Sequence, residues 1–429
     1  MCAALSVAVV AACTGDADRS SSSTPTTTPP PVTTSTTPAR PELRAQLDDP
    51  LVPVVVLPSA PFEGAPKVVG SDGPNLVAFG GVTRDETGMG YRPTDEGAVL
   101  DGATMSWSRL PEPPFEDPTF DPVGVVADGQ LLVSGQACVG YEPVTTTSAT
   151  CRPDELQTAR LDLSALTWER LPSPKGRSGT RMVRMWATPS GVLAMTSTNQ
   201  VQPGSDDSVW SFMATGAHRW TLVDPPPIPI TMVCGFESTV AVASTEHSSD
   251  GRDWAVGGSG FDTQSDRYRN ARAVFWDDEA GEWGRPTDEV VQQPIDLVGG
   301  ACIREGLVWM AMADPWRAAR DETLEPTDQG LYVARPGEVG WERRPFQPPA
   351  GVGLAPFPED PVPSMADPTS VVLLSFVWET PRVLDVDTGT WRTWVGPEVR
   401  SENLTDASLL GHPIIWDRNA GTLVAIRHD

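Results

Sequence analysis

Tyrosine, tryptophan and arginine side chains recur in the polar segments of this sequence, where they could bind a ligand. A guanidinium group forms two parallel hydrogen bonds to a carboxylate, and an aromatic face packs against a sugar or another apolar group. The candidate ligand-binding residues are Tyr91, Arg92, Tyr141, Arg152, Arg177, Arg181, Tyr268, Trp316 and Arg317. The alternative is that these side chains are simply solvated, as exposed arginines commonly are.

The sequence lacks the motifs of several common enzyme classes, including the GxxxxGK[ST] phosphate loop, the GxSxG nucleophile turn, HExxH and paired CxxC. The stretch DVDTG, Asp385 to Gly389, has the spacing that begins a calcium loop but lacks the bidentate Glu that completes one. Because Asp, Thr and Gly also form turns, we interpret it as a turn between two strands. We assign no catalytic residue, metal or other cofactor, and we leave Ca²⁺ open.

The chain is strongly acidic. Its 31 Lys and Arg residues against 57 Asp and Glu residues give a formal net charge of −26. Nucleic acids and anionic membrane surfaces both require compensating basic side chains on their partners. We therefore expect no nucleic acid as a partner and no membrane contact through charged lipid headgroups.

The first residues, MCAALSVAVVAACTG, form an apolar run that is too short to cross a bilayer as a helix. The residues Val10-Ala11-Ala12-Cys13 resemble the lipobox of bacterial lipoprotein signal peptides. That resemblance implies that residues 1–13 are a signal peptide with its lipobox, and that Cys13 carries a lipid with chains such as palmitate. The alternative is an apolar strand that happens to end in cysteine.

A segment dominated by Ser, Thr and Pro follows, DRSSSSTPTTTPPPVTTSTTPAR from Asp18 to Arg40. Such a composition cannot bury enough apolar surface to offset the entropy lost on ordering. We expect residues 14–45 to form a disordered, extended tether that holds a folded domain, residues 46–429, away from a membrane.

Four further cysteines are candidates for disulfides, which persist in exported proteins. Cys138 and Cys151 flank the insertion ACVGYEPVTTTSATCR and would close a short loop. Cys234 and Cys302 occupy similar places in successive repeats, so neighbouring strands could bring them together. The alternative is four reduced, buried thiols.

An internal repeat positions these residues. Six segments share an apolar run, a polar turn, a tryptophan and a proline-rich exit, and the tryptophans recur at intervals of roughly 50 to 60 residues, the length of a four-stranded propeller blade. These tryptophans are Trp107, Trp168, Trp220, Trp283, Trp341 and Trp391. We expect them to take equivalent positions, packed between sheets and largely buried.

A second hairpin precedes each tryptophan segment, as at 125–135, 183–197 and 303–313, so each repeat predicts four strands. One such sheet cannot bury both faces alone, but radially stacked sheets can. The diglycine in Phe79-Gly80-Gly81 and the spaced tryptophans resemble Kelch-type β-propellers. The resemblance implies an all-β fold of four-stranded antiparallel blades.

The two ends of the folded domain complete one another. LPSAPFE, Leu57 to Glu63, repeats LPEPPFE, Leu110 to Glu116, but no earlier strands precede it. The C-terminal stretch ASLLGHPIIWDRNAGTLVAIRHD contains early strands with no fourth strand after them. We therefore predict a seven-bladed β-propeller, closed by an N-terminal strand that joins the C-terminal blade, which leaves no long open edge.

Long inner loops are predicted on one face of this propeller, at 83–96, 136–157, 199–207, 260–270 and 314–329. Most candidate ligand residues lie in them, whereas Arg177 and Arg181 lead into an inner strand and would line the central channel. Long loops on a rigid scaffold tend to carry function. The alternative is that surface loops accumulate residues freely.

We therefore expect an extracytoplasmic, lipid-anchored, monomeric binding module of the cell membrane, whose ligand is an envelope protein or a glycan. The rival hypothesis is a glycan-active enzyme, a sialidase-like hydrolase or a lyase, that uses carboxylates of the loop face. An enzyme should have two carboxylates facing each other across a pocket with arginine support. A binding module should have an apolar or aromatic rim.

The lipid anchor gives the first testable prediction. In the native host, a radioactive fatty acid should label the wild-type protein but not the Cys13→Ala variant, because the thioether forms on that thiol. Equal labelling of the two proteins, or no labelling of either, would contradict the anchor.

Overall fold

The computed structural model describes residues 39–49, 52, 54–62, 66–84, 91–143, 149–174, 181–197, 208–230, 232–236, 239–247, 268–288, 296–303, 306–312, 330–345, 370–373, 382–393, 404–410, 412–417 and 422–426. Within these ranges the fold is all-β apart from one helix, α1 (Pro41–Asp48). No helix in the described ranges is long and apolar enough to cross a membrane.

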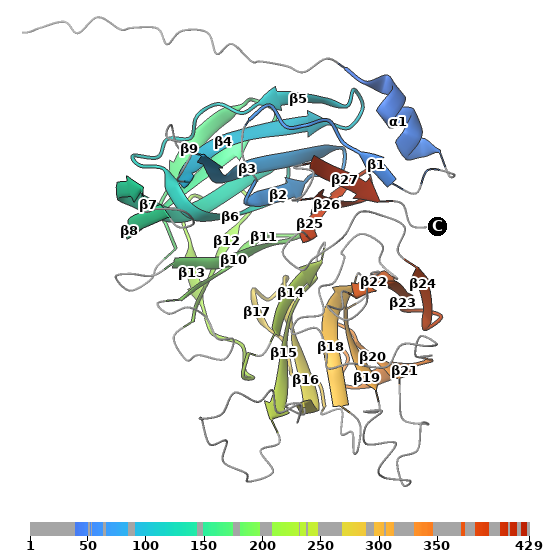
Figure 1. The fold of residues 1–429 in the computed structure, drawn as a ribbon. Helices are drawn as coiled ribbons and strands as arrows, with labels where there is room; N and C mark the ends of the chain where they lie inside the picture. The colour runs from blue at the N-terminus through green and yellow to red at the C-terminus, as the bar shows by residue number, and fades with distance from the viewer. Residues whose placement is uncertain are drawn as a thin grey trace, which may run out of the picture. The chain divides into compact units, whose positions relative to one another are not determined.

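The described strands form seven antiparallel sheets (Figure 1). Sheet 1 contains β2 (Val68–Ser71), β3 (Asn75–Arg84), β4 (Tyr91–Asp101) and β5 (Ser106–Arg109). Sheet 2 contains β6 (Thr119–Ala127), β7 (Gln130–Pro143), β8 (Ala149–Asp162) and β9 (Thr167–Leu171). Sheet 3 contains β10 (Arg181–Thr188), β11 (Gly191–Ser197), β12 (Val209–Ala214) and β13 (Thr221–Val223).

The remaining sheets have the same antiparallel order. Sheet 4 contains β14 (Met232–Phe236), β15 (Thr239–His247), β16 (Tyr268–Asp277) and β17 (Glu282–Trp283). Sheet 5 contains β18 (Asp296–Ile303), β19 (Gly306–Met312), β20 (Gly330–Ala334) and β21 (Trp341–Arg344). Sheet 6 contains β22 (Ser370–Leu373), β23 (Arg382–Asp385) and β24 (Thr390–Thr393). Sheet 7 contains β25 (Leu404–Leu409), β26 (His412–Asp417), β27 (Thr422–Ile426) and β1 (Val54–Val56).

Neighbouring sheets contact one another through their first strands. β2 contacts both β25 and β6, β6 contacts β10, and β18 contacts both β14 and β22. Sheets 3 and 4 meet through β10 and β15. Repeated four-stranded antiparallel sheets that contact each other in chain order fit a β-propeller.

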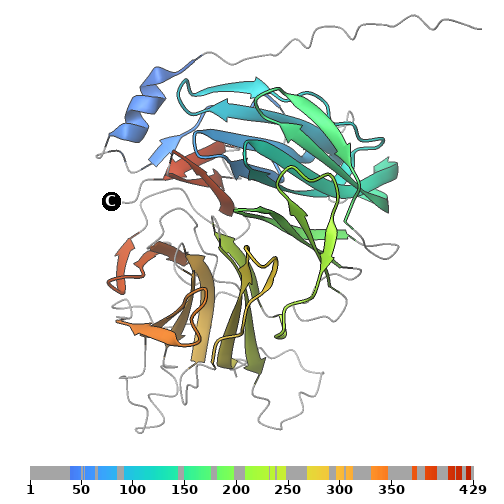
Figure 2. The ribbon, with the colours of Figure 1, turned by 180° about the vertical axis from the view of Figure 1, so that it is seen from behind.

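Sheet 7 joins the two ends of the described chain. β1 pairs with β27 in the register Val54 with Ile426 and Val56 with Val424, and the Leu57 N–H donates to the Leu423 carbonyl at 2.9 Å. Figure 1 and the rear view in Figure 2 both show β1 beside β27. The pairing expected between the N-terminal strand and the C-terminal hairpin is therefore present.

The core is divided into layers between neighbouring sheets. In sheet 1, Leu76 and Ala78 pack towards sheet 7, whereas the alternate residues Val77 and Phe79 pack towards sheet 2. Since successive side chains of a strand point to opposite faces, apolar residues at every position bury both faces of the sheet.

Each described layer includes a tryptophan of the later sheet. In chain order from the layer between sheets 7 and 1 to that between sheets 4 and 5, these are Trp107, Trp168, Trp220, Trp283 and Trp341. Their predicted position between sheets is confirmed. The expectation of large burial holds for Trp107, which is 0 % exposed. The other four and Trp391 are partly buried, and none of them is exposed, which agrees with the expectation.

Three of these tryptophans hydrogen-bond to the segment that leaves the preceding sheet. The indole Nε1–H of Trp107 donates to the Pro58 carbonyl at 2.7 Å, that of Trp168 to Pro111 at 2.8 Å, and that of Trp341 to Asp288 at 3.0 Å. We call this bond the indole clamp. Pro58 and Pro111 are the prolines of the two LP repeats, so the repeated sequence corresponds to a repeated contact.

Four turns between third and fourth strands also share one hydrogen-bonding pattern. An Asp carboxylate accepts the backbone N–H groups two and three residues later, at Asp101, Asp162, Asp277 and Asp385. The residue four positions later has a positive φ, at Met105, Leu166, Gly281 and Gly389. The DVDTG stretch is thus a turn between β23 and β24, as predicted.

The diglycine of the Kelch-like motif forms a bulge between β3 and β4. The register shifts between Phe79 and Gly81, and Gly80 has a φ of 64°. A Cβ atom on Gly80 would lie 2.7 Å from the Pro122 Cγ atom on β6, so glycine allows β3 to approach sheet 2.

Helix α1 changes the boundary predicted for the tether. It begins with Pro41 and covers 41–45, which were expected to be extended and disordered. Leu43 and Leu47 lie one helical turn apart and pack in the layer between sheets 7 and 1, where Leu47 is 3 % exposed. Tertiary packing of two leucines therefore stabilises a helix that composition alone did not predict.

The pairing of β1 gives a prediction about stability. Deletion of residues 1–61 removes β1, the buried Val55 and Leu57 side chains and the acceptor of the Trp107 indole. We expect a loss of about 5 kcal/mol of unfolding free energy relative to a protein that lacks residues 1–49, from which α1 is also absent. Thermal unfolding of the two truncated proteins measures the difference, and equal melting temperatures would show that β1 does not stabilise the domain.

Candidate functional site

The candidate residues that lie on described strands are found at one end of their sheets. We call the end of each sheet where the second strand leads to the third the loop end, and the opposite end the turn end. Tyr91 and Tyr268 begin the third strands of sheets 1 and 4, and Arg181 begins β10 opposite Ser197 at the end of β11. Tyr141 and Arg152 lie near the free ends of β7 and β8.

Two of the predicted long loops are largely strands, which corrects the sequence analysis. Segment 83–96 contains the end of β3 and the start of β4, and 136–157 contains the ends of β7 and β8. In the second case Val139 pairs with Arg152 beyond the last pair with β6, Thr119 with Ala137, so the hairpin extends past its neighbouring strand. The Val, Thr and Tyr residues of this segment favour strands, a preference that the loop prediction overlooked.

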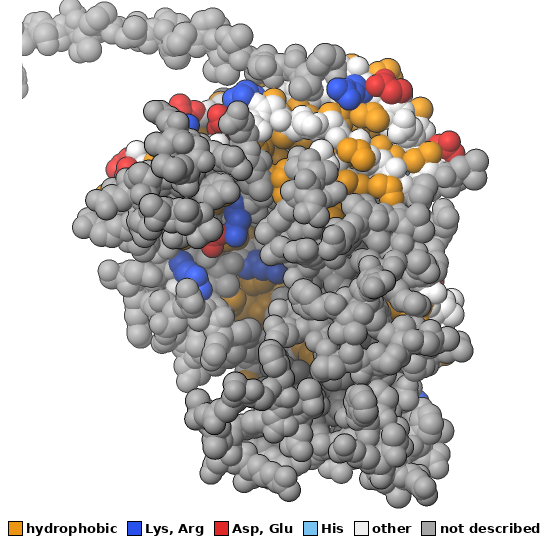
Figure 3. All heavy atoms as spheres, in the orientation of Figure 1, with side chains coloured by type: hydrophobic (Ala, Val, Ile, Leu, Met, Phe, Trp, Pro, Cys, Tyr) orange, Lys and Arg blue, Asp and Glu red, His pale blue; other side chains and the backbone are white. Residues whose placement is uncertain are grey.

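Sheets 1 and 2 present two exposed apolar side chains at their loop ends. Val82 on β3 is 41 % exposed and Phe120 on β6 is 38 % exposed. Both strands approach each other nearby, where Gly80 faces Pro122. Between these sheets the Lys67 Nζ atom lies 2.6 Å from the Asp121 Oδ1 atom, and both side chains are about half exposed. In the view of Figure 3, basic, acidic and apolar side chains of the described residues lie near one another.

Two arginines of the candidate set form no ion pair or side-chain hydrogen bond with another residue in the described part of the chain. Arg92 is exposed on β4, and Arg181 is half-buried at the start of β10. Arg184, which also lies on β10, is half-buried and differs from these two arginines because it already interacts with another group. No ion pair with another described residue therefore occupies the guanidinium groups of Arg92 and Arg181.

Asp95 is the carboxyl group at this end whose pKa is raised, chiefly because it is buried. Its two oxygens accept the Thr119 backbone N–H at 3.1 Å, and the Thr119 hydroxyl donates to one of them. The bond joins β4 of sheet 1 to the start of β6 in sheet 2. The contact between Asp95 and Thr119 therefore fastens the two sheets together.

Other predicted residues cannot be placed in this site. Arg177, Trp316 and Arg317 lie outside the described residues, and so do the side chains of Tyr91, Tyr141, Arg152 and Tyr268. The sequence analysis missed Val82, Phe120, Lys67 and Asp95. Phe120 and Asp121 directly follow the proline-rich segment PPFEDP, which leads from one repeat to the next. This position in the sequence could have indicated that they lie where two sheets meet.

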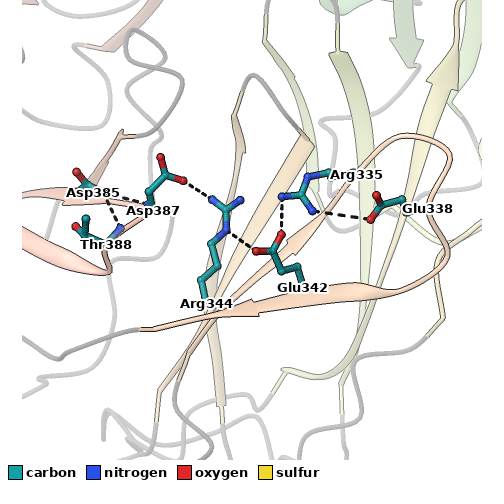
Figure 4. Close-up of polar contacts among 7 residues, drawn as sticks. All are labelled: Arg335, Glu338, Glu342, Arg344, Asp385, Asp387 and Thr388. Atoms are coloured by element: carbon teal, nitrogen blue, oxygen red, sulfur yellow. Dashed lines mark hydrogen bonds and ion pairs between the residues drawn. The ribbon is translucent and has the colours of Figure 1, made fainter.

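The turn end carries an ion-pair network between sheets 5 and 6 (Figure 4). Glu342 accepts from Arg335 at 2.5 Å and from Arg344 at 3.3 Å, and Arg344 reaches Asp387 of the DVDTG turn at 2.7 Å. Hydrogen bonds from Arg335 and then Arg344 lower the pKa of Glu342. Asp387 therefore serves as a contact between sheets, and no group of three metal-ligating residues occurs within the described ranges.

A related network joins sheets 2 and 3 at the turn end. Glu169 accepts from the buried Arg160 at 2.7 Å, and its other oxygen lies 2.6 Å from the His218 Nδ1 atom of the β12–β13 turn. Hydrogen bonding from Arg160 is the main reason that the pKa of Glu169 is lowered. Charged residues of the turn end thus hold sheets together, which leaves the loop end as the candidate binding surface.

One predicted disulfide is confirmed. Cys234 on β14 is bonded to Cys302 on β18. Cys138 is also disulfide-bonded, whereas the side chain of Cys151 is outside the described residues, so the predicted partnership of these two stays a prediction. Cys13 is likewise outside the described residues.

Comparison with known proteins assigns no family. No family model matches the sequence, and no curated protein matches it. A solved structure described as YCF48 bound to D1 peptide aligns with 88 % of this chain and 94 % of its own, at 13 % identity and a TM-score of 0.33. A structure of puromycin hydrolase aligns with 79 % of this chain at 14 % identity and a TM-score of 0.40, and the chain spans about half, 48 %, of that protein. Neither likeness is close enough to support a function.

The Asp95–Thr119 contact gives a prediction at the junction of sheets 1 and 2. Asp95→Ala should lose about 1–3 kcal/mol of unfolding free energy, because the buried Thr119 N–H and hydroxyl lose their acceptor. Asp95→Asn keeps an acceptor and should lose less. Urea unfolding at pH 7 distinguishes the two variants, and equal losses would contradict the hydrogen-bonding role.

The raised pKa of Asp95 adds a pH dependence with a defined sign. The folded state favours protonated Asp95, so the folded protein binds more protons than the unfolded chain between the ordinary and the raised pKa. The wild type should therefore gain stability relative to Asp95→Asn as the pH falls from 7 through the raised pKa. The opposite trend would mean that hydrogen bonds to the ionised carboxylate outweigh its burial.

Proposed function

We propose that the chain is a seven-bladed, Kelch-type β-propeller closed by β1, and that a lipid on Cys13 anchors it to the extracytoplasmic face of the cell membrane. Seven sheets within the described residues, with β1 paired to β27, support the blade count and the closure. The tether in this proposal spans residues 14–40, because α1 begins at Pro41.

The export of the protein is supported by its cysteine chemistry. The Cys234–Cys302 bond joins two residues that are 6 % and 2 % exposed. Disulfides persist in oxidising compartments and are rare in the reducing cytosol. A buried structural disulfide therefore agrees with the lipoprotein signal expected from Val10-Ala11-Ala12-Cys13.

The proposed activity is binding of a segment of another envelope protein at the loop ends of sheets 1 to 3. The observation that carries this proposal is the presence there of exposed Val82 and Phe120 on the same face as Arg92 and Arg181, which lack partners in the described part of the chain. Apolar anchors with arginine groups around them are typical of protein interfaces. The complementary ligand would combine an apolar side chain with a carboxylate.

The glycan-active enzyme is less well supported. Its mechanism needs two carboxyl groups that face each other across the sugar. The buried carboxylate at this end, Asp95, is bonded to Thr119, and Asp121 is paired with Lys67. A binding role requires no free pair of carboxylates.

Site-specific photocrosslinking in the native host tests the proposal. A benzophenone amino acid placed at Val82 or Phe120 should yield protein adducts on illumination. The same group at Leu222 or Val339 should not, although these residues are 52 % and 41 % exposed, because Leu222 lies on the outer strand β13 and Val339 in the turn between β20 and β21.

Charge reversal provides the specificity control for this experiment. The Arg92→Glu, Arg181→Glu protein should lose adducts about tenfold or more, whereas Arg219→Glu, an exposed arginine of the β12–β13 turn, should not. Equal adducts from all four positions, or insensitivity to the reversal at 92 and 181, would contradict the proposed surface. Adducts that a glycosidase removes and a protease does not would favour a glycan ligand.

A further inference from the structure

The described core of the layer between sheets 4 and 5 is rich in alanine, although it also contains Phe275, Trp309 and Tyr332. Five of its eleven buried residues are alanines, Ala241, Ala243, Ala271, Ala273 and Ala334. The neighbouring layer between sheets 3 and 4 contains no buried alanine and includes Trp186, Trp210 and Trp276. Since apolar stabilisation scales with the area buried, the alanine layer gains less from packing than the tryptophan layer.

The Cys234–Cys302 disulfide crosses this alanine layer. Cys234 pairs with Ala241 and Cys302 with Leu307, so both cysteines lie on first strands, where the two sheets meet at their inner edges. A bond between residues 68 positions apart strongly restricts the unfolded chain. The covalent link therefore crosses a layer whose described core has smaller side chains than that of the neighbouring layer between sheets 3 and 4.

The outer edges of the same two sheets have a separate connection. Trp341 on β21 forms its indole clamp with Asp288 at 3.0 Å, and the Asp288 N–H donates to the Val339 carbonyl at 2.7 Å. These bonds involve the fourth strand of sheet 5 and the segment after sheet 4, and neither involves the cysteines. Loss of the disulfide would leave this outer connection in place.

We propose that the disulfide holds the inner edges of sheets 4 and 5 together, so that this interface closes only after Cys234 and Cys302 are oxidised. In the reduced protein, β14 and β18 separate while the clamp at Trp341 persists. The inference concerns the completion of the fold and goes beyond ligand binding at the loop end.

The oxidant implied is a thiol–disulfide oxidoreductase of the exporting compartment. The thiolate of one cysteine attacks the disulfide of this oxidoreductase and forms a mixed disulfide. The thiolate of the other cysteine then attacks the mixed disulfide and displaces the enzyme's sulfur. The two cysteine protons are released, one disulfide forms in this chain, and the two electrons reduce the oxidoreductase to its dithiol. Because both cysteines are almost fully buried in the folded state, exchange has to precede closure of the layer.

Hydrogen exchange and thermal unfolding of the full chain test the proposal. The Cys234→Ala, Cys302→Ala protein should melt about 10 °C below the wild type. Amide exchange should increase about tenfold or more in β14 and β18 and stay unchanged in β2 and β6. The matched control is Cys138→Ala, Cys151→Ala, which also removes two cysteines and should leave exchange in β14 and β18 unchanged.

If the double variant does not fold, a second measurement on the folded wild type tests the proposal instead. The folded wild type is treated with a phosphine reductant and iodoacetamide, and mass spectrometry confirms alkylation of Cys234 and Cys302. Faster exchange in β14 and β18, with β21 still protected, supports the proposal. Unchanged exchange in β14 and β18 after both cysteines are alkylated would overturn it, as would a double variant that melts like the wild type.

Discussion

The indole clamp ties three of the described sheets to the sheet before them. A tryptophan near the start of a fourth strand packs on the preceding sheet and donates its N–H to the segment leaving that sheet, as Trp107 does to Pro58 and Trp168 to Pro111. A buried indole N–H is costly without an acceptor. In sheets 1, 2 and 5, where it forms, the bond therefore favours one specific neighbour at one specific register.

The same contact explains how the two ends of the described chain are joined. Leu57 donates its N–H to Leu423 in sheet 7, as Leu110 does to Gly97 in sheet 1, so β1 corresponds in register to β5. Val54 then occupies the position of Trp107. The Pro58 carbonyl accepts the indole hydrogen bond of Trp107 in sheet 1, just as the Pro111 carbonyl accepts that of Trp168 in sheet 2. A strand from the N-terminal side thus completes the contacts that the C-terminal strands lack.

The interfaces between sheets differ in which interactions replace or reinforce the indole clamp. The indoles of Trp220 and Trp283 have no acceptor within the described residues. Sheets 2 and 3 instead share the Arg160–Glu169–His218 network, and sheets 3 and 4 share a layer in which Trp210 and Trp283 pack edge to face at 5.1 Å. Sheets 4 and 5 combine a clamp with a disulfide. These ion pairs, rings and covalent links all connect one described sheet to the next.

Much of the fold could be predicted from sequence because its contacts are repeated. The alternation of Leu76, Val77, Ala78 and Phe79, the Asp-containing turns and the recurring tryptophans are local patterns that dictate strands and their buried faces. The LP repeat and the unmatched C-terminal strands even indicated which ends pair. Helix α1 was missed because Leu43 and Leu47 are stabilised by residues more than 300 positions away, such as Ile414 and Leu423.

In the candidate site, sequence identified Arg92 and Arg181 as cations able to bind a ligand. Only the tertiary structure decided that Asp95 is held by Thr119 and that Val82 and Phe120 stay exposed, because burial and hydrogen bonding depend on which sheets meet, and no local pattern specifies that.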